Sequence, residues 1–297
     1  MGNLDFEKTA VKVSMVSIVG NTILSGLKLL AGIFANSGAM ISDAVHSASD
    51  VFSSIIVIIG VKLSSKKSDK EHPYGHERLE CVAAIVLAVT LLITGLFIGE
   101  NAVKTLFSGN SGDIQIPGAS ALVAAVISIA VKEAMFWYTH YYGVVLNSGA
   151  IMADAWHHRS DALSSIGALI GIAGARMGVP VLEPIASIII CLFIFKASYD
   201  IFKDAVDKMV DHSCDDETEN QLRECASSQN GVNGVDMMHT RIFGNKIYVD
   251  IEISVDGNKT LTEGHNIAET VHYEIEKQFP KVKHIMVHVN PDEKGGE

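Results

Sequence analysis

Two stretches of the chain carry the same ionisable residues within otherwise apolar sequence. Residues 38–61 read GAMISDAVHSASDVFSSIIVIIGV and residues 149–172 read GAIMADAWHHRSDALSSIGALIGI, with identical residues at half of the aligned positions. Each copy contains an aspartate, a histidine three residues later and a second aspartate four residues after that. Imidazole and carboxylate groups together are ligands for divalent ions such as zinc. The repeat therefore predicts a metal site built from both copies.

Helical spacing places these side chains on one face of each segment. Residues three, four and seven positions apart share a helix face, so each copy forms one polar stripe. The stripes are Asp43, His46 and Asp50 in the first copy, and Asp154, His157 and Asp161 in the second. The two H-x-x-x-D pairs offer ligands from successive turns, so we predict that the ion is held by His46, Asp50, His157 and Asp161.

Other uses of such stripes are hydrogen bonding between helices and the relay of protons. We favour metal binding because two independent structural networks have no reason to repeat the same spacing. Asp43 and Asp154 lie one turn before the pairs and are expected to orient the imidazoles. His158 is left without a role. Three roles are open for Arg159: its side chain reaches the membrane surface, it pairs with Asp154, or it repels cations in one access state.

The elements that position these residues are predicted to be membrane helices. A helix needs about 20 residues to cross a bilayer, and apolar runs of this length occupy residues 11–34, 38–63, 79–103, 117–140, 147–176 and 181–204. Lys and Arg lie between the second and third runs and beside the first and last, whereas the opposite loops lack them. The positive-inside rule then places both termini in the cytoplasm.

A change in composition predicts two domains, a six-helix transmembrane bundle at residues 1–208 and a cytoplasmic α+β domain at 209–297. The order helix–strand–strand–helix–strand is indicated by amphipathic and alternating segments, with a turn at Gly244 and Asn245. These segments are 216–229, 234–243, 246–255, 261–279 and 282–291. This order resembles a ferredoxin-like arrangement.

Composition also excludes several classes of function. The net charge of −11 argues against nucleic acid as a partner. The sequence has no H-E-x-x-H motif and no general base beside an open zinc position, which argues against an enzyme. The cysteines have no C-x-x-C spacing and are expected to be reduced thiols; they are Cys81, Cys191, Cys214 and Cys225.

The paired motifs SDAVHSASD and ADAWHHRSD resemble those of the cation diffusion facilitator family of divalent-metal transporters, over nearly the whole chain. The resemblance implies a homodimer that exports metal from the cytoplasm in exchange for protons. Carried over, the family's transport site falls on His46, Asp50, His157 and Asp161. Two histidines with two aspartates imply zinc in this family, often with cadmium or cobalt, whereas manganese members tend to replace histidine with aspartate or asparagine.

The resemblance also implies two further metal sites. The segment SDKEHPYGHERLE matches the loop site of some members at Asp69, His72 and His76, although these residues could instead only shape the loop. In the cytoplasmic domain the family's ligand positions fall on Asp236, Asp250, His265 and His288. Asp236 and Asp250 replace family histidines, and Asn290 replaces an acidic ligand. These replacements weaken the case for a full two-zinc site. A metal-sensing dimer interface is the resulting hypothesis.

The function expected from the sequence is therefore proton-coupled export of divalent cations by alternating access, with Zn²⁺ first and Cd²⁺, Co²⁺ or Fe²⁺ as further substrates. The alternatives are an iron- or manganese-preferring transporter of the same family and a membrane sensor that binds metal without moving it. A channel would show neither saturation nor pH dependence. The expected location is the plasma membrane of a bacterium or archaeon, because the chain lacks a His-rich loop between the fourth and fifth spans.

Overall fold

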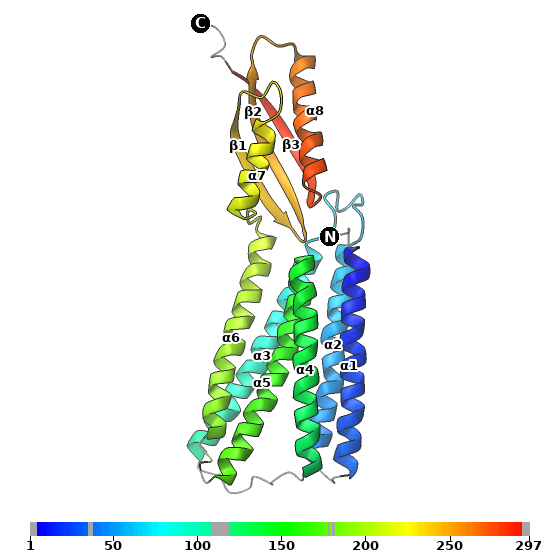
Figure 1. The fold of residues 1–297 in the computed structure, drawn as a ribbon, viewed down its shortest axis with the longest axis vertical. Coiled ribbons are helices and arrows are strands. Elements are labelled where there is room, and N and C mark those ends of the chain that lie inside the picture. The colour runs from blue at the N-terminus through cyan, green and yellow to red at the C-terminus, as the bar shows by residue number, and fades with distance from the viewer. Residues whose placement is uncertain (1–4, 35–37, 109–118, 178, 180–181, 293–297) are drawn as a thin grey trace. The chain divides into compact units, whose positions relative to one another are not determined.

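The computed structural model describes residues 5–34, 38–108, 119–177, 179 and 182–292. The chain divides into two compact units, Met1–Val206 and Asp207–Glu297. Figure 1 shows long helices running beside one another in the first unit, and a small sheet with two helices in the second.

The described part of the first unit is built from long helices. Their bounds are α1 Phe6–Phe34, α2 Gly38–Ser64, α3 Leu79–Ser108, α4 Ala119–Leu146, α5 Gly149–Arg176 and α6 Leu182–Met209, the last ending within the second unit. Two stretches within them, Phe6–Leu30 and Leu79–Phe107, are long and apolar enough by themselves to count as candidate spans. The remaining helices are of similar length, but within the described residues they do not count as candidate spans by this measure, so the number of spans stays a prediction.

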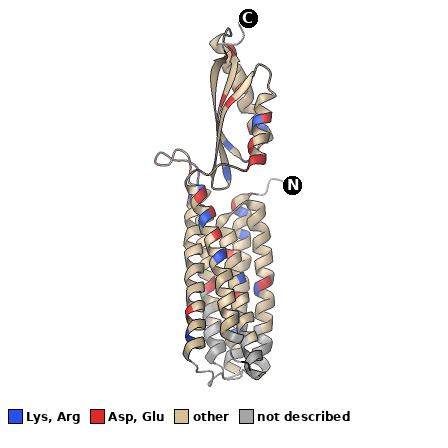
Figure 2. Cartoon of the chain, turned by 90° about the vertical axis from the view of Figure 1, so that its left-hand side faces the viewer, with Lys and Arg blue, Asp and Glu red and all other residues tan. Residues whose placement is uncertain are grey.

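The outer surface of the first unit is apolar. Phe97, Leu192 and Phe193 each expose 61% of their surface, and Figure 2 shows few charged residues along these helices. A soluble protein rarely leaves so many large apolar side chains uncovered. Contact with lipid hydrocarbon explains this surface.

The interior of the first unit brings α2, α4 and α5 together. α5 packs on α2, α3 and α4, while α1 packs on α2 and α4. A short connection sets the pairing of α4 with α5: Asn147 adopts a left-handed φ of 51°, and the Ser148 hydroxyl accepts a hydrogen bond of 3.2 Å from the amide of Ile151. Asparagine tolerates this conformation, and serine caps the new helix. The chain therefore reverses directly after α4.

Close approach of α2 and α3 depends on Gly60, which gives a stability prediction. A Cβ atom at Gly60 would lie 2.4 Å from the Cβ of Ala83, whereas one at Gly26 on α1 would meet nothing within 4 Å. Overpacking of this kind costs about 1–3 kcal/mol. We expect Gly60→Ala to lower the melting temperature of the purified protein in detergent.

Gly26→Ala is the matched control for this prediction. It adds the same methyl group to an exposed helical position, where alanine is the better helix former, so its melting temperature should equal or exceed that of the wild type. Equal stability of the two variants would contradict the packing of α2 on α3.

The second unit has the element order predicted from the sequence. Its elements are α7 Asp216–Ser227, β1 Gly234–Phe243, β2 Lys246–Asp256, α8 Leu261–Gln278 and β3 Val282–Asp292. β1 and β2 pair antiparallel across a tight turn in which Gly244 has a φ of 63°, and β3 pairs parallel to β2 after the crossover through α8. The α+β prediction is confirmed.

The sheet of this unit has one covered face and one open face. Val249, Ile251 and Ile253 alternate along β2 and are fully buried in a core shared with α7 and α8. Asp250 and Glu252 point to the other face and are only half-buried. The open face therefore carries the acidic residues of β2.

Candidate metal centre

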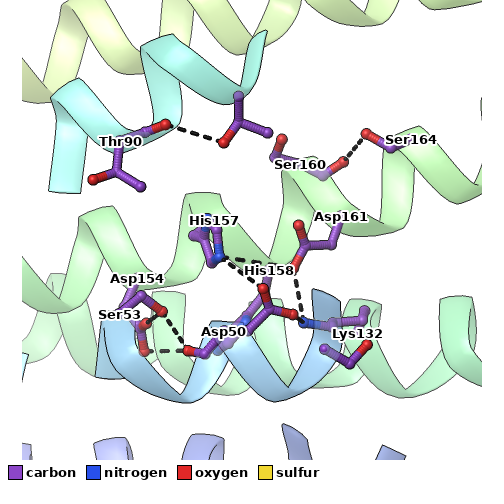
Figure 3. Close-up of polar contacts among 12 residues, drawn as sticks. Asp50, Ser53, Thr90, Lys132, Asp154, His157, His158, Ser160, Asp161 and Ser164 are labelled. Carbon is purple, nitrogen blue, oxygen red and sulfur yellow. Dashed lines mark hydrogen bonds and ion pairs between the residues drawn. The ribbon is translucent and has the colours of Figure 1, made fainter. Parts of the chain in front are cut away.

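Three of the side chains predicted to bind metal converge inside the first unit. Asp50 on α2 and His157 and Asp161 on α5 each offer a ligand atom, and these atoms lie within 4.8 Å of one another. Nε2 of His157 is 3.3 Å from Oδ1 of Asp50 and 4.0 Å from Oδ2 of Asp161. The two aspartates are 3% and 8% exposed. Figure 3 shows all three side chains pointing into one space.

These separations suit a small tetrahedral ion. Zinc binds imidazole nitrogen and carboxylate oxygen at about 2.0–2.2 Å, which places neighbouring tetrahedral ligands about 3.3 Å apart. The distance between Asp50 and His157 already has this value. A modest movement of the Asp161 carboxylate would bring the third ligand to the same ion.

The fourth predicted ligand, His46, lies outside the described side chains, as does Asp43. The backbone of α2 is continuous through both positions. His46 precedes Asp50 by four residues, so helical geometry places it on the same face, one turn away. The prediction that His46 is a ligand is therefore supported only by its four-residue spacing from Asp50 on a continuous helix.

Lys132 on α4 also lies in this site, although it belongs to neither of the two repeated segments. Its Nζ donates hydrogen bonds to Oδ2 of Asp50 at 2.6 Å and to Oδ2 of Asp161 at 2.7 Å. Lys132 is almost fully buried, and its contacts are drawn in Figure 3. The two carboxylates are thus bridged by an ammonium group of the protein itself.

Asp154 belongs to a second polar group beside the first. It accepts hydrogen bonds from the hydroxyls of Ser53 and Ser54 at 3.1 and 3.2 Å. Its Oδ2 lies 3.6 Å from Nε2 of His158, which in turn is 3.1 Å from the hydroxyl of Ser17. Asp154 therefore contacts His158, whereas the expectation was that it would orient His157. These contacts join α1, α2 and α5.

Arg159 has a partner that the sequence analysis did not consider. Its guanidinium lies 2.8 Å from the carboxylate of Glu133 on α4 and 4.4 Å from the centre of the Phe136 ring. Both the ion pair and the cation–π contact tie α5 to α4. Of the three alternatives for Arg159, pairing with an acidic residue describes its position, but the residue is not Asp154.

The predicted loop ligands lie together between α2 and α3. Asp69 is 3.4 Å from Nδ1 of His72 and 3.4 Å from Nε2 of His76. Hydrogen bonds from the Lys66 side chain and from the His72 amide hold the pKa of the Asp69 carboxyl well below its usual value. Since metal ligands must be deprotonated, Asp69 is ready to bind at any physiological pH.

This loop cluster predicts a separate zinc equivalent. We expect His76→Ala to lower the number of zinc ions bound by the full-length protein by one, as measured by equilibrium dialysis, because two ligands hold zinc far more weakly than three. His272→Ala is the control, since His272 on α8 pairs with the carboxylate of Glu276 at 3.2 Å and belongs to neither group of candidate ligands found among the described residues. An unchanged zinc count in His76→Ala would show that these residues only shape the loop.

Two known domain families match the chain with little interruption. The cation efflux transmembrane domain matches residues 14–210, and the cytoplasmic domain of cation efflux proteins matches residues 214–292. The chain belongs to the cation diffusion facilitator family. It is therefore a membrane protein of a family that exports divalent metal cations, and it carries the cytoplasmic dimerisation domain of that family.

Full-length relatives in this family have several named roles. The manganese efflux system protein MneP of Bacillus subtilis (strain 168) is 32% identical over 292 residues, which cover 96% of this chain and 97% of the relative. The uncharacterized transporter MJ0449 of Methanocaldococcus jannaschii is 36% identical over 276 residues, covering 93% and 96%. The magnetosome protein MamM of Magnetospirillum gryphiswaldense is 31% identical over 260 residues, covering 87% and 81%.

The four ligands predicted in the cytoplasmic domain do not come together within a single chain. Asp250 on β2 and His288 on β3 lie on neighbouring strands, but His288 is paired in register with Glu252. His265 is on α8 and is 68% exposed at its side chain. Among the described residues of this unit, no three His, Cys, Asp or Glu side chains come close enough to share an ion.

Asn290 joins two acidic residues on the open face of the sheet. Its side-chain amide donates hydrogen bonds to Asp236 at 3.0 Å and to Glu252 at 3.2 Å. An amide nitrogen therefore lies between two carboxylates at the position for which the family resemblance implied an acidic ligand. The sequence identified Asp236 and Asn290, but Glu252 emerges only from the register of β2 with its neighbours.

Proposed function

We propose that this protein exports divalent cations from the cytoplasm, with zinc as the preferred substrate, through the site formed by Asp50, His157 and Asp161. The observation that carries the proposal is the convergence of these three buried ligands from two repeated segments. His46 is the fourth ligand in this proposal. Burying two carboxylates beside an imidazole is costly unless they have a partner. In this structure the partner is Lys132, and a transported cation would supply the same compensating charge.

Proton exchange follows from the chemistry of the ligands. A metal ion binds only after the imidazoles and carboxylates have lost their protons. When the site opens to the outside, protons compete for the same lone pairs and favour metal release. Alternating access around a site between packed helices then couples export of the metal to entry of protons.

The proposed arrangement is a homodimer in the plasma membrane, with six spans and both termini in the cytoplasm. Residues 1–208 form the transport domain in this proposal, and residues 209–297 form the cytoplasmic domain. The distribution of lysine and arginine supports this orientation. The apolar outer surface of the helices supports insertion in the bilayer.

Manganese is the second candidate substrate, because the relative MneP is named as a manganese efflux protein. The ligand chemistry favours zinc, since imidazole suits zinc and carboxylate or carbonyl oxygen suits manganese. Cadmium, cobalt and iron are further candidates, because they also accept imidazole.

We further propose that the cytoplasmic domain senses metal between two subunits. Asp236, Asp250 and His288 lie on β1, β2 and β3, and His265 lies on α8. Because one chain does not bring them together, the ion would have to draw ligands from both subunits. Zinc should then tighten the full-length dimer, and an Asp250→Ala, His288→Ala double variant should lose this response in sedimentation measurements.

The proposed transport function is tested by a pH-jump flux assay in liposomes. Purified protein is reconstituted, a proton gradient is imposed, and uptake of zinc, cadmium, iron and manganese is followed separately. Saturable zinc flux that follows the proton gradient is expected. Metal binding without flux would indicate a sensor, and flux that neither saturates nor follows pH would indicate a channel.

A further inference from the structure

Lys132 on α4 forms ion pairs with one aspartate on α2 and one on α5. Its Nζ lies 2.6 Å from Oδ2 of Asp50 and 2.7 Å from Oδ2 of Asp161, and all three side chains are at least nine-tenths buried. Figure 3 shows the lysine side chain reaching these carboxylates from the side opposite His157 in the drawing. The ammonium group therefore occupies the space where the two aspartates approach each other.

A metal ion held beside His157 would compete with Lys132 for Oδ2 of Asp161, and it would take Oδ1 of the same Asp50 carboxylate that Lys132 contacts through Oδ2. An ion bound to either Oδ2 at about 2.0–2.2 Å would be no more than about 5 Å from the ammonium nitrogen. A divalent ion and an ammonium at that distance repel strongly in a buried site, because little water screens them. The site accommodates either cation in this position, but not both with their contacts intact.

We propose that Lys132 is a tethered cation, which occupies the transport site when metal is absent and which an arriving ion must displace. This inference rests on the proposed function of Asp50, His157 and Asp161 as metal ligands. The lysine stays charged throughout, and what changes is which cation contacts the two carboxylates. Its return when the metal leaves gives the emptied site a counter-charge.

The tethered cation serves two needs of a transporter. An emptied site with two bare carboxylates would be costly to bury, so the ammonium allows the carrier to reorient without metal. The same group lowers the affinity for metal, because each binding event must break two ion pairs. Weaker binding favours release, and so a faster cycle.

A purely structural ion pair makes the opposite prediction for affinity. If Lys132 only held α2, α4 and α5 together, its removal would loosen the ligands and weaken metal binding. If it competes with the metal, its removal strengthens binding. The sign of the change in zinc affinity therefore separates the two roles.

The test compares full-length Lys132→Met with the wild type by zinc competition dialysis at one fixed pH, and by zinc flux in liposomes. We expect the dissociation constant for zinc to fall by at least about tenfold, through the loss of a like charge, and maximal flux to fall because release is slower. Lys132→Arg should restore a dissociation constant near that of the wild type. Lys196→Met is the control, since Lys196 forms an exposed pair with Asp200 at 2.9 Å.

Failure of the inference and failure of the proposed site give different results. If Asp161→Ala binds one zinc ion fewer than the wild type, while Lys132→Met binds zinc as the wild type does or more weakly, the ligand site stands and the tethered-cation proposal is wrong. If Asp161→Ala binds zinc normally, the site itself is wrong. A cryo-EM structure of the zinc-loaded wild type decides the matter even if the variants do not fold: Nζ of Lys132 should have left both carboxylates, and zinc beside an unmoved Nζ would overturn the proposal.

Discussion

Zinc efflux by Asp161→Ala protein in liposomes is expected to be at least about 100-fold slower than efflux by the wild type. The substitution removes one of three converging ligands, and even the loss of an outer partner of a metal ligand commonly costs 10–100-fold in affinity or activity. Of the two aspartates that Lys132 contacts, the substitution also leaves only Asp50 in place. Binding and transport should therefore fall together.

The control for this prediction separates transport from folding. Asp200→Ala removes an aspartate of the same unit whose partner, Lys196, lies on the exposed side of α6. This variant should retain wild-type efflux, and both variants should reach the membrane in equal amounts. Normal zinc efflux by purified Asp161→Ala would refute the assignment of Asp161.

Replacing His157 with aspartate is expected to shift metal preference from zinc towards manganese. Nε2 of His157 is 3.3 Å from Asp50, so its replacement changes a ligand in the centre of the cluster. Imidazole suits zinc, whereas carboxylate suits manganese. We expect the ratio of zinc to manganese transport efficiency, measured separately for each ion in liposomes, to fall by at least about tenfold.

His140→Asp provides the comparison for this change in selectivity. His140 lies on α4 beside the rings of Phe136 and Trp137, and it is not part of either group of candidate ligands. The same change of side chain at that position should leave the ratio unchanged. An unaltered ratio in His157→Asp would mean that selectivity is set elsewhere.

The ligand cluster could be predicted from the sequence because its motif occurs in two similar segments. The repeated H-x-x-x-D spacing identified Asp50, His157 and Asp161, and the structure places their ligand atoms together. The turn at Gly244 and the alternation along β2 identified the strands of the cytoplasmic unit with similar success. In each case the spacing of residues in the sequence follows the geometric repeat of the helix or strand that carries them.

Lys132 could not be found by the same reasoning, because it occurs once and on a third helix. A repeat search compares the two copies and says nothing about what lies between them. The available signal was a lysine followed by Glu133 inside an apolar run, since an ionisable residue in a membrane segment usually has a functional partner. Which partner it has depends on the packing of α4 against α5 and on how near α2 lies to Lys132, and this arrangement is not readable from one helix alone.

The cytoplasmic ligands illustrate a different limit. Asp236, Asp250, His265 and His288 were assigned by resemblance, which aligns positions but does not bring side chains together. In one chain Asn290 instead links Asp236 to Glu252. A site shared between two subunits depends on a surface contact that no single sequence pattern encodes.

The location of bound zinc tests the central claim most directly. Crystals of the full-length protein grown with zinc can be measured at the zinc absorption edge, where anomalous scattering locates the ion. Our account predicts a peak about 2.0–2.2 Å from a carboxylate oxygen of Asp50, a carboxylate oxygen of Asp161 and Nε2 of His157. Zinc in the loop or cytoplasmic unit with no peak between α2 and α5, from protein that still transports zinc, would contradict it.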